Sequence, residues 1–380
     1  MPMAHSMSRS PSTIDEAGAD VRLIGGLPDP ALFPRVEWLR HYRAAVNDVP
    51  NRQLGYPGPF GVPRLREALA NYIGRVRGVA TTPDQMIITS GLTQAVVLVA
   101  RALRARGIGA IAIEDPCFSF HREAISNAGL EVVPVPVDAD GLDVAKLLTH
   151  KVRAVLVAPA HAYPTGTVLS ASRRSALVKW AHDNDGLIIE DDYDAEFRYD
   201  RAPIGALQGL SPQRVAFAGC ASKTLTPALR LGWLAVPDWL VDGAVRQKLL
   251  DDMGNTVLEQ LAMARFIETG GLARHLRRVR PIYRRRRDAA LASIAASLPD
   301  AIPTGVAAGL HMYVSLPADC NEMELVERAR NRGVLVEGAS WHWSVPAAAP
   351  PALVIGYGAI AEPAIRNGLA ILGSIYQEHR

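Results

Sequence analysis

Lysine, cysteine and long apolar runs are scarce in this chain of 380 residues, and each shortage narrows what the protein can be. The three cysteines, Cys117, Cys220 and Cys320, are scattered without the paired spacing of a metal site. We therefore expect reduced thiols, no bound metal and a cytoplasmic location. No apolar run reaches the length of a transmembrane helix, and a net charge of +3 does not favour a nucleic-acid partner. The sequence predicts a soluble globular protein with a small-molecule ligand and no membrane partner.

Only five of the 41 basic residues are lysines, and one of them, Lys223, lies in the segment Arg214–Trp233 between hydroxyl side chains. Residues 215–219 suit a short buried strand, and a lysine at the end of such a strand can lose its proton by desolvation. A neutral amine is nucleophilic toward an aldehyde. Ser222 and Arg230 could hold a phosphate. This layout suits a Schiff base with pyridoxal 5'-phosphate, although this stretch alone fits a surface lysine equally well.

Strands and helices alternate through most of the chain, which predicts an α/β fold with a doubly wound, mostly parallel sheet and a smaller α+β domain. We expect strands at 85–89, 110–114, 131–137, 154–158, 187–193 and 215–219, with helices at 95–105, 172–184 and from 118 to 128. Ligands of such sheets bind beyond the carboxyl ends of the strands. The residues expected at these ends on one side are Thr93, Phe118, Tyr163, Asp191, Tyr193 and Lys223.

Two glycine-containing loops are further candidates for ligand contact. Ser90–Gln94 connects a strand to a helix, and the free N–H groups of that helix start would attract an anion, although most such turns bind nothing. Gly25 and Gly26 would let the backbone approach a ligand closely, or they form a plain turn.

We expect five regions along the chain. They are a disordered lead-in (1–21), an N-terminal segment of the small domain and dimer arm (22–50), a large cofactor-binding domain (51–240), long interdomain helices (241–300) and a small C-terminal α+β domain (301–380). The basic run 274–287 could be a nucleic-acid arm. Its apolar positions fall at helical spacing, which favours a solvated amphipathic helix that Pro281 should kink.

Taken together, these segments resemble the fold-type I pyridoxal-phosphate enzymes of aminotransferase class I/II, and most closely the aminotransferase-like domain of MocR-type proteins. The matching motifs, in family order, are GGLPDPALFP, YPGPFGVPRLREALANYI, ITSGLTQAV, EDP, HAYPTG, IIEDDYDAEFRY, SKTLTPALRLGW and RHLRRVR. They extend over nearly the whole chain. The resemblance implies pyridoxal 5'-phosphate as the cofactor.

The resemblance also implies a role for each matching residue. Lys223 would carry the cofactor, Asp191 would pair with its pyridine nitrogen, and Tyr193 would donate to its phenolic oxygen. Phe118 would stack on the ring. The phosphate would be held by Leu92, Thr93, Ser222 and Arg230, with Tyr56 reaching across from the partner subunit of a homodimer. Simpler interpretations exist for single residues: Phe118 as core, Tyr56 as a turn residue and Asp192 as a solvated neighbour.

Three features depart from the family pattern. About twenty polar residues precede GGLPDP where MocR-type regulators have a winged-helix DNA-binding domain, which favours an enzyme over a DNA-binding regulator. Val354 stands where many relatives place the arginine that clamps the substrate carboxylate, and Tyr163 replaces the asparagine of an NPTG motif. Loss of a bidentate clamp is a serious loss of orientation. Backbone N–H groups around Gly25 and Gly26 could bind the carboxylate instead, or the substrate is unusual.

The substrate side is otherwise predicted from two segments. His161 begins the HAYPTG motif, and Trp341 and Trp343 flank a Gly/Ser-bounded loop that could line a pocket for a larger or aromatic substrate. Partly buried structural aromatics are at least as good an interpretation of the two tryptophans.

Three functions follow from this pattern. The default is transamination of an amino acid or related amine through external aldimine and quinonoid intermediates, with Lys223 removing the Cα proton. The same intermediates permit β- or γ-elimination and replacement in a bond-forming biosynthetic enzyme. A non-catalytic sensor that binds its effector on the cofactor is the alternative from another class.

Overall fold

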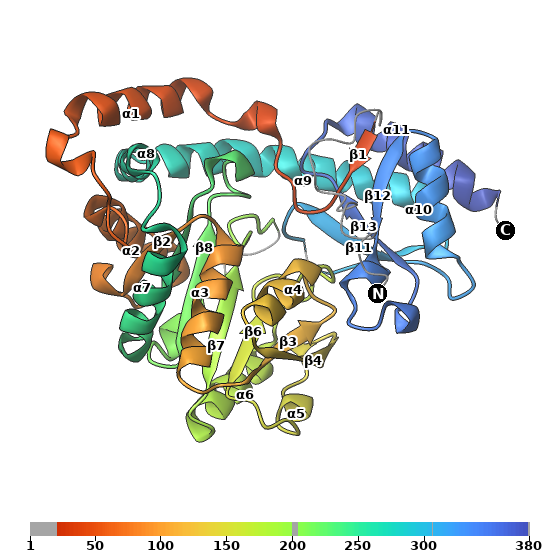
Figure 1. The fold of residues 1–380 in the computed structure, drawn as a ribbon. Helices are drawn as coiled ribbons and strands as arrows, with labels where there is room; N and C mark the ends of the chain where they lie inside the picture. Colours follow the sequence, from red (N-terminus) through yellow and green to blue (C-terminus); the bar gives the residue numbers. More distant parts are fainter. Residues whose placement is uncertain (1–20, 200–203, 306, 379–380) are drawn as a thin grey trace, which may run out of the picture.

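The computed structural model describes residues 21–199, 204–305 and 307–378, which form two α/β units of unequal size (Figure 1). The larger unit is built on a sheet with the strand order β2-β9-β8-β7-β6-β3-β4-β5. Its strands are β2 (Met86–Thr89), β3 (Ala110–Asp115), β4 (Glu131–Asp138), β5 (Gly141–Leu142), β6 (Ala154–Val157), β7 (Leu187–Asp192), β8 (Val215–Cys220) and β9 (Gly232–Ala235). Strands β8, β7, β6, β3 and β4 are parallel, whereas β2, β9 and β5 pair antiparallel. The predicted α/β fold with a mostly parallel sheet is confirmed.

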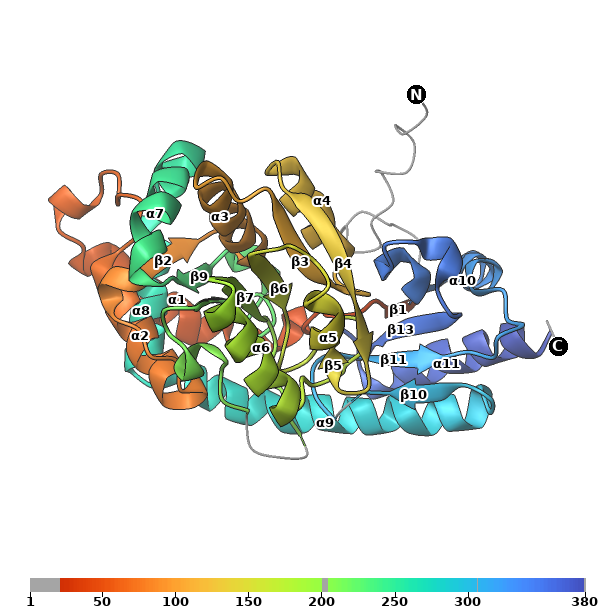
Figure 2. The same cartoon turned by 90° about the horizontal axis from the view of Figure 1, so that it is seen from below.

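Helices cover both faces of this sheet, because successive side chains of a strand point to opposite faces. Ile111 and Ile113 of β3 pack into a cluster with α3 and α4, whereas Ala112 packs into a cluster with α6. The helices on the first face are α3 (Leu92–Ala105), α4 (Ser119–Asn127) and α7 (Asp238–Asp252), and those on the second are α5 (Val144–Leu147) and α6 (Ala171–Asp183). Figure 2 shows the two groups on either side of the strands.

The smaller unit has a sheet of order β1-β12-β13-β11-β10. Its elements are β1 (Val21–Leu23), β10 (Ile302–Thr304), β11 (His311–Ser315), β12 (Val334–Gly338), β13 (Ala352–Gly356), α10 (Glu322–Asn331) and α11 (Glu362–Gln377). Strand β1 pairs parallel with β12, so the chain starts in the small unit before it builds the large one. Val21 therefore belongs to a strand rather than to the predicted lead-in, whose other residues lie outside the described part of the chain.

Three helices connect the two units or pack at the far end of the large one. They are α1 (Arg35–Asp48), α8 (Val257–Glu268) and α9 (Gly271–Ser297), with α2 (Pro63–Arg77) beside α8. Helix α9 extends along both units (Figure 2), and its apolar side is buried at Leu276, Val279 and Tyr283. Most arginines of the basic run are exposed, which agrees with the predicted amphipathic helix, whereas Arg286 is buried and pairs with Asp29. The helix continues through Pro281 without a break.

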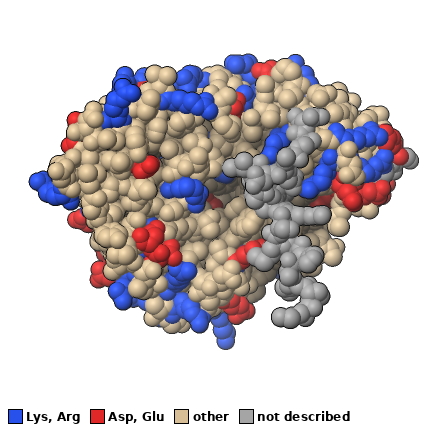
Figure 3. Space-filling model, turned by 45° about the horizontal axis from the view of Figure 1, so that its top comes forward, with Lys and Arg blue, Asp and Glu red and all other residues tan. Residues whose placement is uncertain are grey.

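The surface agrees with the modest net charge. Figure 3 shows basic and acidic side chains interspersed over one face of the molecule. Within the described residues, no helix combines the length and the apolar character needed to cross a membrane.

Candidate active site

Lys223 lies in the turn that follows β8, whose six residues are all buried. The lysine side chain is partly buried and points toward the loop that leaves β1, where a side chain at Gly26 would begin 3.5 Å from Lys223 Nζ. Gly26 has a φ of +69°, a conformation that glycine adopts without strain. The two predicted segments, GGLPDP and SKTLTP, therefore meet at the lysine amine.

Asp191 occupies the end of the neighbouring strand β7, opposite Ala218 of β8. Its carboxylate is buried, and Oδ1 has no hydrogen-bond partner among the described residues. Burial raises the pKa of Asp191 well above its usual value, and the negative charges of Asp192, Asp194 and Glu114 raise it further, while Lys223 acts in the opposite direction. The raised pKa and the unpaired Oδ1 together show a buried carboxyl group whose charged form is not stabilised by a hydrogen bond from a cationic N–H donor among the described residues.

His121 lies close to this carboxylate, with Nδ1 3.8 Å from Asp191 Oδ2. Burial lowers the pKa of His121 to about 4, so the imidazole is neutral at physiological pH and does not neutralise Asp191. The protonated pyridine nitrogen of pyridoxal 5'-phosphate would supply the missing donor and positive charge. The site thus fits the cofactor at this atom.

The predicted phosphate-binding loop leads into α3. Gly91 is its N-cap residue, with a φ of +119°. A side chain at Gly91 would begin 3.2 Å from both terminal nitrogens of Arg230, so the guanidinium lies directly over the helix start. Leu92 and Thr93 form the first turn, where the backbone N–H groups lack helical partners. A guanidinium above free N–H groups is a good anion site. Ser222, beside Lys223, is partly buried in the adjoining turn.

Aromatic rings lie beside Asp191. Phe118 and Tyr163 meet edge to face with ring centroids 5.7 Å apart, and the Tyr163 ring centroid lies 6.4 Å from that of Tyr193. A cavity lined by Phe118, Tyr163, His121 and Asp191 has a volume of about 20 Å³, which is room for about one water molecule.

Tyr193 belongs to a buried polar group with His161 and Asp194. The Tyr193 hydroxyl lies 3.0 Å from His161 Nδ1, and the same nitrogen lies 3.0 Å from Asp194 Oδ2. Burial and the charges of Asp194 and Asp191 raise the pKa of Tyr193 well above 10, which keeps the phenol protonated as a donor. The His311 ring lies tilted beside that of His161, with centroids 5.1 Å apart, and together with Asp194 these residues offer nitrogen and oxygen atoms within 4.8 Å of one another that could hold a metal ion.

The opposite end of the site is formed by the small unit. Tyr163 donates its hydroxyl to Glu337 Oε2 at 3.1 Å, and His342 Nε2 lies 3.0 Å from Glu337 Oε1. Val354 is the cross-strand partner of Glu337. A side chain at Gly25 would begin 2.8 Å from Val354 Cγ1 and 2.9 Å from the Tyr163 hydroxyl, so these groups form one continuous wall.

The loop that carries the two tryptophans is a 3₁₀ turn (Ala339–His342). Trp341 is 40% exposed and Trp343 is partly buried, whereas His342 between them is buried and faces Glu337. Arg122 of α4 donates to the carbonyls of Trp341, His342 and Trp343. Ser344 donates its N–H and hydroxyl to Asp115 at 2.8 and 2.5 Å, so this loop is tied to the large unit.

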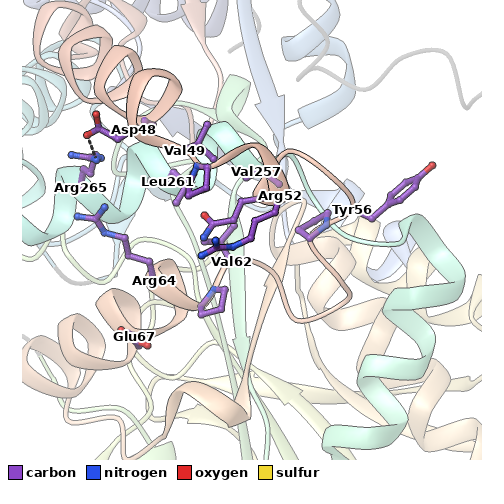
Figure 4. Close-up of a pocket in the computed structure, with 15 residues that line it drawn as sticks. Asp48, Val49, Arg52, Tyr56, Val62, Arg64, Glu67, Val257, Leu261 and Arg265 are labelled. Carbon is purple, nitrogen blue, oxygen red and sulfur yellow. Dashed lines mark hydrogen bonds and ion pairs between the residues drawn. The ribbon is translucent and has the colours of Figure 1, made fainter.

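Tyr56 is 83% exposed on the loop before α2. It borders a separate pocket of about 590 Å³ whose walls come from the α1–α2 connection and from α8. Figure 4 shows its side chain directed away from the other labelled residues of that pocket. Its predicted contact with a cofactor phosphate in a partner subunit stays a prediction.

The interpretation of Asp192 as a solvated neighbour is wrong. It is buried and forms a bidentate ion pair with Arg77, with distances of 2.8 and 2.9 Å. The adjacent carboxylates of Asp191 and Asp192 thus point to opposite faces of β7, one toward the candidate site and one toward α2.

Sequence reasoning missed His121, Asp194, Glu337 and His342. A local signal existed for His121, which follows Phe118 by three residues and so shares its side of α4. Asp194 stands next to Tyr193 in the matching motif. Glu337 and His342 come close to Tyr163 only through the packing of the small unit, and no local pattern indicated them.

The chain is similar to known protein families and structures along most of its length. The family model for aminotransferase class I and II matches residues 40–343. The chain is 33% identical over 346 residues to the uncharacterized HTH-type transcriptional regulator YhdI of Bacillus subtilis (strain 168), which covers 90% of this chain and 73% of that protein. It is also 33% identical over 352 residues to the HTH-type pyridoxine biosynthesis transcriptional regulator PdxR of Corynebacterium glutamicum, covering 92% and 75%. An archaeal alanine:glyoxylate aminotransferase superposes with a TM-score of 0.88 at 26% identity, covering 95% of this chain and 91% of that one.

Proposed function

Because the chain belongs to the aminotransferase class I and II family, with a fold-type I architecture and pyridoxal 5'-phosphate as its cofactor, we propose that it is an enzyme that transfers an amino group from a small amine. The observation that carries this proposal is the pair formed by Lys223 and Asp191. A partly buried amine follows β8, and a buried carboxylate without a donor lies near the end of the adjacent strand β7, where it lines a small cavity with aromatic rings.

The cofactor, when bound, supplies an aldehyde that takes up the amino group and a ring that accepts the electrons released at the substrate carbon. Asp191 Oδ1 would accept a hydrogen bond from the ring nitrogen of the bound cofactor and favour its protonated form. Lys223 Nζ would take the proton from the substrate carbon and give it back. Arg230 and the start of α3 would hold the phosphate.

Tyr193 would donate its hydroxyl to the phenolic oxygen of the bound cofactor. His161 and Asp194 position that hydroxyl, because Asp194 holds the His161 ring in one orientation. Phe118 would lie against the ring and exclude water. Tyr56 would reach the phosphate of a second copy of the chain in a homodimer with shared sites, and its exposure in the single chain is compatible with this role.

The test uses the purified protein with added cofactor. We expect a visible absorbance band in the wild type that is absent in Lys223→Ala, and equal amounts of pyridoxamine phosphate and carbonyl product after one turnover with a reactive amine. A protein that releases a leaving group without pyridoxamine phosphate performs elimination or replacement instead. A protein with no visible band contradicts the whole proposal.

A second candidate is an effector sensor without turnover, and the relatives that are transcriptional regulators favour it. In that case the same residues bind the amine on the cofactor, and the proton of the substrate carbon stays in place. Stopped-flow absorbance separates the two functions. A band that shifts once on mixing and then persists supports the sensor, whereas decay to pyridoxamine phosphate excludes it.

A further inference from the structure

Glu337 occupies the place on the small-unit wall next to the missing arginine. It is the antiparallel partner of Val354, and the side chains of such a pair lie on the same face of the sheet. Glu337 is 8% exposed and Val354 is fully buried. The wall therefore presents an apolar side chain and a carboxylate where a guanidinium would bind a substrate carboxylate.

The hydrogen bonds of Glu337 leave it able to accept more. Each carboxylate oxygen accepts one bond, Oε2 from the Tyr163 hydroxyl and Oε1 from His342. An ionised carboxylate has about four acceptor sites, so about two remain. Within the part of the chain that is described, His342 is the one basic side chain recorded in an ion pair with Glu337.

The carboxylate also lies close to the reacting groups. The Tyr163 side chain that bonds Glu337 extends toward Gly26, because a side chain at Gly26 would begin 3.9 Å from Tyr163 Cε2 and 3.5 Å from Lys223 Nζ. Lys223, Gly26, Tyr163 and Glu337 are thus successive neighbours along one wall. A substrate carboxylate placed beside Glu337 would meet a like charge.

We propose that the substrate is an aliphatic amine with a second cationic group, an ammonium or guanidinium, and no carboxylate on its reacting carbon, and that Glu337 binds this second group. The inference rests on the proposed function. Transfer of the amino group converts R–CH₂NH₂ and the cofactor's aldehyde into R–CHO and the cofactor's aminomethyl group, so no further oxidant is needed. Tyr163 and His342 orient the Glu337 carboxylate toward the substrate.

The test compares amines that differ only in the carboxylate. Putrescine is matched with ornithine, cadaverine with lysine, and agmatine with arginine, and the change in the visible cofactor band is titrated with each. We expect half-saturation at a concentration at least tenfold lower for each decarboxylated partner. Glu337→Gln should reduce that preference about tenfold, whereas Glu327→Gln, an exposed charge-matched control on α10, should leave it unchanged.

A second variant, at the cross-strand partner of Glu337, provides a test that does not require Glu337→Gln to fold. Val354→Arg should shift the preference at least tenfold toward the amino acids. Equal or better binding of the amino acids by the wild type overturns the inference, and so does a visible band that none of these amines alters. In both cases the visible band would still show that the cofactor is bound, so the proposed function would stand. Absence of the band would reject the proposed function as well.

Discussion

The two walls of the candidate site differ in how closely they follow the family. The wall from the large unit presents Lys223, Asp191 and Arg230 at strand ends and a helix start, in the positions that the motifs predict. The wall from the small unit presents Val354 and Glu337, at the place where the resemblance leads us to expect an arginine. Under the proposed function, cofactor binding and substrate recognition would be separable, because they would depend on different walls.

The largest effect should come from the amine on the large-unit wall. Lys223→Ala removes both the attachment point of the cofactor and the base, so turnover should fall by about 10⁴-fold or more. Lys179→Ala is the control, since that lysine forms only an exposed ion pair with Asp183. Steady-state kinetics measure the loss. Turnover within tenfold of wild type would contradict the role of Lys223 as attachment point and base.

Substitutions of the two neighbouring carboxylates of β7 should affect different properties, cofactor binding for one and stability for the other. Asp191→Asn should weaken cofactor binding about 100-fold, because a charge-assisted hydrogen bond is lost. Asp192→Asn should instead lower the free energy of unfolding by about 3–5 kcal/mol, because it leaves the buried guanidinium of Arg77 uncompensated. Cofactor titration and urea unfolding measure the two effects. The same defect in both variants would contradict the division of roles.

The pH dependence of stability should originate in the large-unit wall. Burial raises the pKa of Glu114 to about 7 from an ordinary value of 4.5. Since the folded state binds this proton more tightly than the unfolded state, stability is greatest below about pH 4.5 and falls until about pH 7. The loss is about 3 kcal/mol. Burial also raises the pKa of Glu190 and Glu196 to about 7, so these groups contribute slopes of the same sign. Urea unfolding of the cofactor-free protein at several pH values should show the combined slope, and Glu114→Gln should remove only the share of Glu114. An unchanged slope in Glu114→Gln would contradict the assignment to Glu114.

The smallest effect should come from the contacts that join the walls. Arg122→Met removes the donors to the carbonyls of the Trp341–Trp343 loop, so the small-unit wall should lose its register against α4. We expect KM to rise about tenfold with little change in kcat, the signature of lost uniform binding. Arg104→Met, on the exposed side of α3, serves as the control. A fall in kcat with unchanged KM would place Arg122 in the chemistry instead.

Local patterns predicted the large-unit wall because its residues follow buried strands directly. The apolar run 187–189 ends two residues before Asp191, and the run 215–219 ends four residues before Lys223. Parallel pairing then brings both side chains to one edge of the sheet. The small-unit wall depends on contacts between distant segments. Tyr163 and Glu337 are 174 residues apart, and no periodicity in either segment predicts that they meet.

Two features of the fold could not be predicted from the sequence, because each depends on a distant segment. Strand β1 is only three residues long and pairs with β12 more than 300 residues later. A three-residue strand has no alternation to detect, so it was interpreted as lead-in and turn. The buried ion pair of Asp192 likewise depends on Arg77 from a different helix, and a charged residue after a strand otherwise indicates solvent.

Strand β1 has a mechanical consequence. It hydrogen-bonds along the strand that bears Glu337, and the chain then continues past Gly26 at the lysine amine before it reaches α1. Strand β1 thus ties the sheet that carries Glu337 to the loop beside the lysine amine, so a shift of that sheet would also move Gly26.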